Sequence, residues 1–127
     1  MRGSKHDLPV SFDGMGVVLR EAEWGDMNVA IESFPAGADS APIFKGLPDD
    51  RCQCVHWGYV IKGRYRAVYR DHEEVFSAGD AYYLSPGHTT YFEEVTELVE
   101  YSPKGEYQKT LEVVGRNIAS MQSGAAG

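Results

Sequence analysis

The feature that most constrains the fold is the frequency of turn residues between residues 14 and 102. Gly, Pro and Asp leave only short apolar runs between them. Nine of these runs are rich in Val, Ile, Tyr, Phe and Thr and are expected to form β-strands: Met15–Arg20, Asn28–Phe34, Ala41–Phe44, Cys52–Ile61, Arg64–Arg70, Glu73–Phe76, Ala81–Leu84, Thr89–Glu93 and Leu98–Tyr101. Many short strands at near-regular spacing predict an all-β sandwich or barrel.

The two ends of the chain differ from this strand-rich segment. Residues 1–13 are polar and rich in turn residues, which predicts a flexible N-terminal arm before a barrel over residues 14–102. Residues 103–127 are expected to form a C-terminal helix and a disordered tail. The helix is predicted from apolar residues at spacings of four, three and four, namely Tyr107, Leu111, Val114 and Ile118. Ser102 as N-cap and Pro103 at the first helical position are expected to begin it.

Charge and hydropathy argue against several classes of partner. The chain has 12 Lys and Arg against 19 Asp and Glu, a net charge of −7, which disfavours nucleic-acid binding. No run of about 18 apolar residues is present, so no membrane contact is expected. The N-terminus lacks the apolar stretch of a secretory signal, which predicts a cytoplasmic protein with two free thiols.

Two segments carry residues suited to metal binding. If residues 52–61 form a strand, Cys52, Cys54 and His56 point to the same face. His88 follows a Pro-Gly turn at the start of another strand. Two thiolates and two imidazoles make a Cys2His2 set, which favours zinc among the divalent transition metals, with iron, copper, nickel and manganese as alternatives. The competing interpretation is metal-free packing, because cysteine is often buried without any function.

The surrounding residues resemble the two motifs of small single-domain cupins. A hairpin glycine, Gly63, follows the first segment, and the second contains Gly79-Asp80 and then Ser85-Pro86-Gly87. The resemblance extends from Met27 to Tyr101 and is to a subgroup with a Cys-x-Cys-x-His-Trp-Gly-Tyr segment and a Pro-Gly-His turn. It implies a double-stranded β-helix (a jelly-roll barrel), with a short C-terminal helix packed across an outer face. It also implies a metal pocket and a homodimer.

The chain departs from the cupin pattern at the ligand positions. His56 stands where the first motif has its glutamate, Cys52 where it has its second histidine, and Asp50 where it has its first. Thr90 stands where the second motif has its histidine, while His88 lies two residues upstream on the same strand face. The usual set of three histidines and one glutamate is therefore absent.

Two classes of function follow from these residues. The first is a metal-binding cupin with a small-molecule pocket. As a metalloenzyme, such a cupin would act on a small organic substrate. Its expected metal ligands are Cys52, Cys54, His56 and His88, and its expected pocket residues are Asp50, Thr90 and Phe92. The alternative is a non-catalytic module that binds a ligand or holds a structural metal. The number of protein ligands on the metal distinguishes the two classes, because a catalytic site keeps one coordination position open for substrate.

Overall fold

The computed structural model describes residues 1–124, which form nine strands, two short 3-10 helices and one α-helix. The elements in chain order are β1 (Val10–Gly14), β2 (Val17–Trp24), β3 (Met27–Phe34), η1 (Ala41–Phe44), η2 (Pro48–Asp50), β4 (His56–Lys62), β5 (Arg64–Val68), β6 (Glu73–Ser77), β7 (Ala81–Leu84), β8 (Thr89–Phe92), β9 (Thr96–Pro103) and α1 (Lys104–Gly124). All strand pairs are antiparallel, in one sheet of order β1-β2-β3-β9-β4-β7 and another of order β6-β5-β8.

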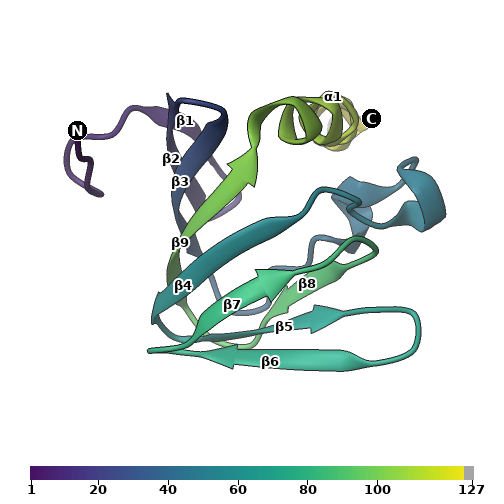
Figure 1. Ribbon diagram of the computed structural model, residues 1–127. Helices are drawn as coiled ribbons and strands as arrows, with labels where there is room; N and C mark the ends of the chain where they lie inside the picture. The colour runs from purple at the N-terminus through teal and green to yellow at the C-terminus, as the bar shows by residue number, and fades with distance from the viewer. Residues whose placement is uncertain (125–127) are drawn as a thin grey trace.

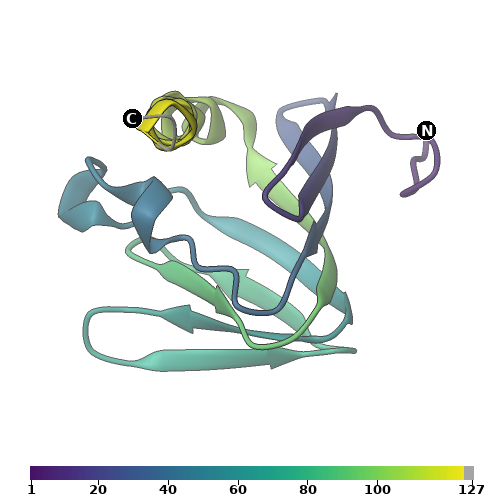
Figure 2. The same cartoon turned by 180° about the vertical axis from the view of Figure 1, so that it is seen from behind.

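The two sheets pack face to face, and the core lies between them. Figures 1 and 2 show α1 and the two 3-10 helices gathered at one end of this barrel. Side chains alternate along the strands: Tyr82 and Leu84 of β7 are buried, whereas Ala81 and Tyr83 are exposed. The core cluster is Val60, Tyr65, Ala67, Tyr69, Tyr82, Leu84, Phe92 and Leu98. The predicted all-β barrel with a C-terminal helix is confirmed.

One of the expected strands is absent, and another begins later than expected. Residues 41–44 form η1 instead of a strand, because Pro42 begins a helical turn in which the amides of Ile43 and Phe44 donate to the Ser40 carbonyl. The strand expected from Cys52 begins only at His56. The Cys52 backbone instead forms an isolated antiparallel bridge with His88.

The ends of the chain also differ from expectation. Residues 10–13, expected in a flexible arm, belong to β1, which pairs with β2. Leu8 is buried, and its carbonyl accepts a hydrogen bond from Arg20 Nη1 at 2.7 Å. Pro103 ends β9, so the helix begins one residue after its expected first position. The helix extends to Gly124, and residues 125–127 of the expected disordered tail lie outside the described residues.

Helix α1 covers the end of the barrel where η1 lies, instead of packing across an outer face. Asn117 Nδ2 donates hydrogen bonds to the carbonyls of Ile43 and Lys45, at 2.8 and 2.7 Å. At its first turns, the Tyr107 hydroxyl donates to Glu21 Oε2 of β2 at 2.5 Å. The helix therefore bridges η1 and the six-stranded sheet. No helix in the described part of the chain combines the length and apolar character needed to cross a membrane.

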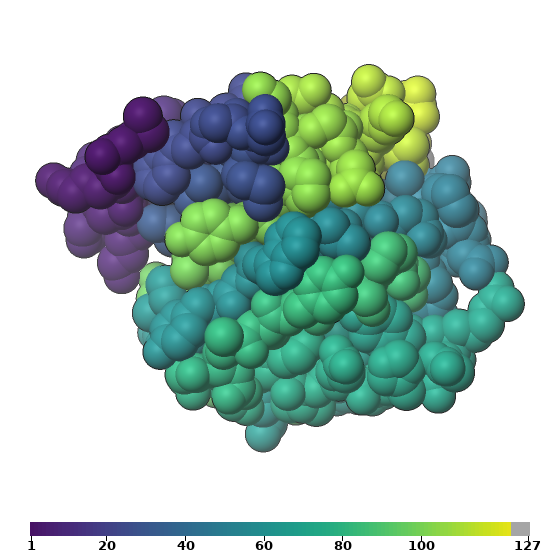
Figure 3. Space-filling model, viewed as in Figure 1, coloured from purple at the N-terminus to yellow at the C-terminus, as the bar shows by residue number. Residues whose placement is uncertain are grey.

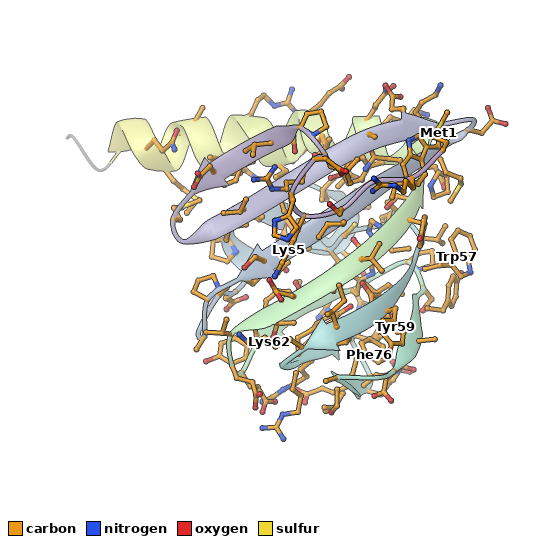
Figure 4. All side chains as sticks on the ribbon, turned by 90° about the vertical axis from the view of Figure 1, so that its left-hand side faces the viewer. Met1, Lys5, Trp57, Tyr59, Lys62 and Phe76 are labelled. Atoms are coloured by element: carbon orange, nitrogen blue, oxygen red, sulfur yellow. The ribbon has the colours of Figure 1, made fainter. Side chains whose placement is uncertain are left out.

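The outer side of β4, β7 and β9 carries four exposed aromatic residues, which we call the aromatic face. They are Trp57, Tyr59, Tyr83 and Tyr101, with exposed fractions of 46%, 46%, 46% and 39%. Trp57 is the centre of the group, because it pairs with Tyr83 on one side and Tyr101 on the other. Figure 4 shows Trp57 and Tyr59 on the outer side of the sheet, and Figure 3 shows β4 and β7 side by side on this face of the molecule.

Candidate metal centre

Cys52, His56 and His88 meet inside the barrel near the end that α1 covers. The bridge between Cys52 and His88 brings two of them together: the Cys52 amide donates to the His88 carbonyl at 2.9 Å, and the Gly87 amide donates to the Cys52 carbonyl at 2.8 Å. His56 is the first residue of β4 and its side chain points inward. Three separate backbone positions therefore supply one cluster.

The ligand atoms of these three residues have a spacing suited to a single metal ion. One ligand atom from each lies within 4.8 Å of the others. Cys52 Sγ lies 3.6 Å from His56 Nε2. A sulfur at about 2.3 Å and a nitrogen at about 2.0 Å from a tetrahedral ion would be about 3.5 Å apart. The two imidazole centroids are 5.4 Å apart. The Cys-His pair thus already has the separation that shared coordination requires.

Hydrogen bonds to the outer nitrogens orient both imidazoles. His56 Nδ1 lies 2.6 Å from the Ser102 hydroxyl oxygen and 3.5 Å from Glu100 Oε2. His88 Nδ1 lies 2.8 Å from the Ser85 carbonyl oxygen, which can only accept a proton. With Nδ1 protonated, each histidine keeps a free lone pair on Nε2. This is the tautomer that a metal-binding histidine needs.

Burial keeps the Cys52 thiol and the His88 imidazole uncharged. The exposed fractions of Cys52, His56 and His88 are 2%, 5% and 1%. Burial raises the pKa of the Cys52 thiol to about 12 and lowers the pKa of His88 to about 4. A neutral thiol and a neutral imidazole are therefore the resting forms at pH 7.

Cys54 does not join this cluster, although it was expected to be the fourth ligand. Its side chain is buried, but Cys54 is not among the described residues whose ligand atoms lie within 4.8 Å of one another. Its thiol donates to the Val55 carbonyl at 3.4 Å. Burial, followed by the neighbouring Cys52, raises its pKa to about 12. The strand alternation that grouped Cys54 with Cys52 and His56 is absent, because residues 52–55 precede β4.

The three expected pocket residues make contacts of their own. Asp50 is exposed and accepts a hydrogen bond from the Gly46 amide at 2.8 Å, so it stabilises a loop. Thr90 donates from its hydroxyl to Ser40 Oγ at 3.0 Å. Phe92 is buried in the core, where its ring stacks on Phe34 at a centroid distance of 4.0 Å.

A buried acidic network beside His56 was missed by sequence reasoning. Glu100 and Ser102 lie on the inward face of β9, and Glu100 Oε1 accepts a hydrogen bond from the Tyr82 hydroxyl at 2.7 Å. Glu32 on β3 is buried nearby, and burial followed by the charge of Glu100 raises its pKa well above the usual range. The available signal was alternation, which places Leu98 and Glu100 on one face of the expected strand Leu98–Tyr101. Ser102 would join that face only if the strand extended past Tyr101, as β9 does.

Helix α1 and η1 enclose the cluster from the outside. The Tyr107 ring stands edge-on to His56 at 6.3 Å, and the Phe44 ring stands edge-on to His88 at 6.4 Å. Thr110 lies beside the Cys52 thiol. On the far side of Tyr107 lies a cleft of about 310 Å³, whose lining residues are Glu21, Ala22, Glu23, Asn28, Lys104, Tyr107, Gln108 and Leu111. Tyr107 therefore separates the cluster from an open cleft.

Comparison with known proteins supports the fold. No protein-family model and no curated protein matches this sequence. Among solved structures, an RmlC-like cupin from Shewanella frigidimarina has a TM-score of 0.58 and 16% identity, over 80% of this chain and 88% of that chain. KdgF from Halomonas sp. has a TM-score of 0.53 and 19% identity, over 80% of this chain and 94% of that chain.

A variant of oxalate decarboxylase from B. subtilis has a TM-score of 0.56 and 17% identity, over 80% of this chain and 28% of that chain. At such identities the likeness concerns the fold. This chain has the cupin-type jelly-roll fold.

Proposed function

We propose that this chain is a metal-binding cupin that acts on a small organic molecule, with Cys52, His56 and His88 as its metal ligands. The observation that carries the proposal is the convergence of their three ligand atoms within 4.8 Å. The donor set favours zinc, with iron, copper, nickel or manganese as alternatives. When bound, such an ion supplies Lewis acidity that polarises an oxygen of the substrate.

The chain itself prepares this site. Ser102 and Glu100 hold His56, and the Ser85 carbonyl holds His88, so that both imidazoles present Nε2 to the same point. Three protein ligands leave the fourth tetrahedral position for a small molecule, which is the arrangement typical of catalytic sites. The cleft beyond Tyr107 supports an approach for that molecule from the side of α1. One structural neighbour is named a decarboxylase, which supports a small organic substrate.

The second candidate is a non-catalytic cupin with a structural metal. The observation in its favour is burial, because each of the three ligands is at most 5% exposed and α1 and η1 enclose them. A structural site is closed by four protein ligands. Cys54 is the expected fourth donor in that case, and its thiol would have to turn toward the cluster.

Metal analysis of protein purified without nickel resin tests the proposal. We expect about one equivalent of a transition metal in the wild type and a loss of most of it in His56→Ala. His72→Ala is the matched control, because the half-exposed His72 side chain bonds to neighbouring acidic side chains and stacks on Tyr69, and it does not belong to the cluster. Equal metal content in wild type and His56→Ala would contradict the proposal, as would wild-type protein that takes up no added Zn²⁺ or Co²⁺. X-ray absorption on the loaded protein separates the candidates, since one sulfur ligand supports the open site and two support the structural one.

A further inference from the structure

The three proposed metal ligands are almost completely shielded from solvent. Cys52, His56 and His88 are each at most 5% exposed. None of them lines the cleft of about 310 Å³ beside α1. A small molecule that takes the fourth coordination position of a bound metal must therefore pass the side chains that cover the ligands.

Tyr107 is the side chain that lies between the cleft and the cluster. It lines the cleft, and its ring also stands edge-on to the His56 ring at 6.3 Å. One turn further along α1, Thr110 is 8% exposed and lies beside the Cys52 thiol. Displacement of the Tyr107 ring would therefore extend the cleft toward His56, while Thr110 would still cover Cys52.

A hydrogen bond at its tip holds the Tyr107 ring in this position. The Tyr107 hydroxyl donates to Glu21 Oε2 at 2.5 Å. The same oxygen accepts from Asn28 Nδ2 at 2.9 Å, and Glu21 Oε1 accepts from the Ser11 hydroxyl. Glu21 therefore stays hydrogen-bonded when Tyr107 turns away, and the released hydroxyl can bond to water in the cleft. Such a movement leaves no buried polar group unpaired.

The helix that carries this side chain is fixed at both ends. The Lys104 amide donates to the Asp26 carbonyl at 3.0 Å, and Asn117 Nδ2 donates to the carbonyls of Ile43 and Lys45. Movement of the whole helix would break these hydrogen bonds, whereas rotation of one side chain keeps them. Rotation of the side chain is therefore the less costly way to open a path to the cluster.

We propose that Tyr107 is a side-chain gate that limits the size of the molecules that reach the metal from the cleft. This inference rests on the proposed function, because it assigns an entry route to the open coordination position. In the closed position the ring covers His56, and in the open position the hydroxyl leaves Glu21 and the ring turns into the cleft. The admitted molecule would be small and polar, since two glutamates, a lysine, an asparagine and a glutamine line the cleft.

Co²⁺-loaded protein at pH 8 tests the gate, because the visible absorption of the ion reports a ligand in its open position. Imidazole and 4-phenylimidazole are the probes, since both bind metal through the same kind of nitrogen and they differ mainly in size. Stopped-flow mixing measures their association and dissociation rates. In the wild type we expect 4-phenylimidazole to associate at least about tenfold more slowly than imidazole.

Two variants at Tyr107 separate the hydrogen bond from the ring. Tyr107→Phe removes the hydrogen bond to Glu21 and should raise both rates for imidazole about threefold to tenfold, the value of one hydrogen bond. The equilibrium affinity should be unchanged, because a gate alters how fast a ligand passes and not how strongly the metal holds it. Tyr107→Ala removes the ring and should reduce the difference between the two probes to less than about threefold.

Val113→Ala is the matched control for loosening of the helix. Val113 lies on α1 beside Gly46 and does not line the cleft. Its substitution should leave both rates and the size selectivity unchanged. All variants should hold as much Co²⁺ as the wild type.

The outcomes that contradict the gate differ from those that contradict the proposed function. Unchanged rates in both Tyr107 variants would overturn the gate and leave the proposed function standing. Equal acceleration in Val113→Ala and Tyr107→Ala would do the same, because the whole helix would then be the moving part. Wild-type protein that holds no metal would overturn both, as would loaded wild type and loaded Tyr107→Ala that bind neither probe.

Discussion

His56 Nδ1 and the Ser102 hydroxyl oxygen lie 2.6 Å apart, although 46 residues separate them in the sequence. Pairing of β4 with β9 creates this contact, because Trp57 lies opposite Tyr101 and brings the preceding and following residues together. Ser102 is 2% exposed, so water does not compete for the hydrogen bond. This contact therefore fixes the orientation of the His56 ring, with Nε2 facing Cys52 Sγ.

We expect Ser102→Ala to weaken metal binding by about tenfold to a hundredfold, the usual effect of losing a hydrogen bond that orients a ligand. Competition with a chelating indicator measures the affinity. Ser33→Ala is the control. Ser102 pairs with Asn28 near the start of β3, whereas Ser33 pairs with Glu97 near the end of that strand. Unchanged affinity in Ser102→Ala would show that the contact does not orient His56.

The two cysteines should differ in their importance for metal binding. Cys52→Ala removes a member of the cluster and should abolish most of the thiolate-to-metal absorption of the Co²⁺ protein. Cys54→Ala should retain both the absorption and the stoichiometry, because Cys54 is outside the group of converging ligand atoms. Loss of metal in both variants would instead support two thiolate ligands and the structural-metal candidate.

His88 should make the metal-free protein sensitive to acid. Burial lowers its folded pKa to about 4 from an ordinary value of 6.5. The unfolded chain therefore binds more protons between these pH values, and stability falls as pH falls from about 6.5 to about 4. The loss integrates to about 3 kcal/mol. Urea unfolding across this range should show that the stability of wild type relative to His88→Gln decreases by about this amount toward pH 4.

Glu32 also contributes to the pH dependence of stability, so the effect of His88 is measured as the difference between wild type and His88→Gln. Its raised folded pKa acts in the opposite direction, since stability from a buried protonated carboxyl is lost as pH rises. Wild type and His88→Gln share Glu32, so the comparison removes its contribution. A pH-independent difference between the two proteins would contradict a neutral, buried His88.

The hairpin glycine should be the most sensitive of the turn positions. Gly63 has a φ of +88°, and a Cβ there would lie 2.2 Å from the Val95 carbonyl oxygen. Gly79 has a φ of +95° but no heavy atom within 4 Å of such a Cβ. Gly79→Ala should thus cost about 1 to 2 kcal/mol from backbone strain alone. Gly63→Ala should cost clearly more in the same urea titration, and equal costs would mean that the β4–β5 turn relaxes freely.

We propose that the aromatic face pairs two copies of this chain. Exposed aromatic residues at this density are typical of protein interfaces. Sedimentation analysis should find a wild-type dimer, and Trp57→Glu should convert it to a monomer. Val75→Glu is the control, because Val75 is 53% exposed on β6 of the other sheet. A monomeric wild type at all concentrations would contradict this assignment.

The local sequence pattern was sufficient to predict the strands in which buried and exposed side chains alternate regularly. The expected strand Ala81–Leu84 is β7 without change, and Asn28–Phe34 lies within β3. In each, the period-two pattern and the bounding turn residues are properties of a short segment of sequence. The all-β barrel class follows from many such segments together.

The candidate site was only partly predictable, because its geometry depends on contacts between distant segments. Cys52 and His56 were expected together from strand alternation, yet the bridge from Cys52 to His88 is what sets their spacing. Glu100 and Ser102 meet His56 only through the pairing of β4 with β9. No local pattern states which strands become neighbours, so the hydrogen-bond partners of the ligands were not predictable.

Helix α1 gives the two thiols a second use, as reporters of local unfolding. Tyr107 and Thr110 stand over His56 and Cys52, and Cys52 and Cys54 are each 2% exposed. We expect a reagent in solution to reach these sulfurs when the helix detaches from the barrel. In metal-free protein, the rate of thiol labelling therefore measures the free energy of helix opening, as amide exchange does for backbone groups. The stability of this 21-residue helix and the accessibility of the two thiols should therefore change together.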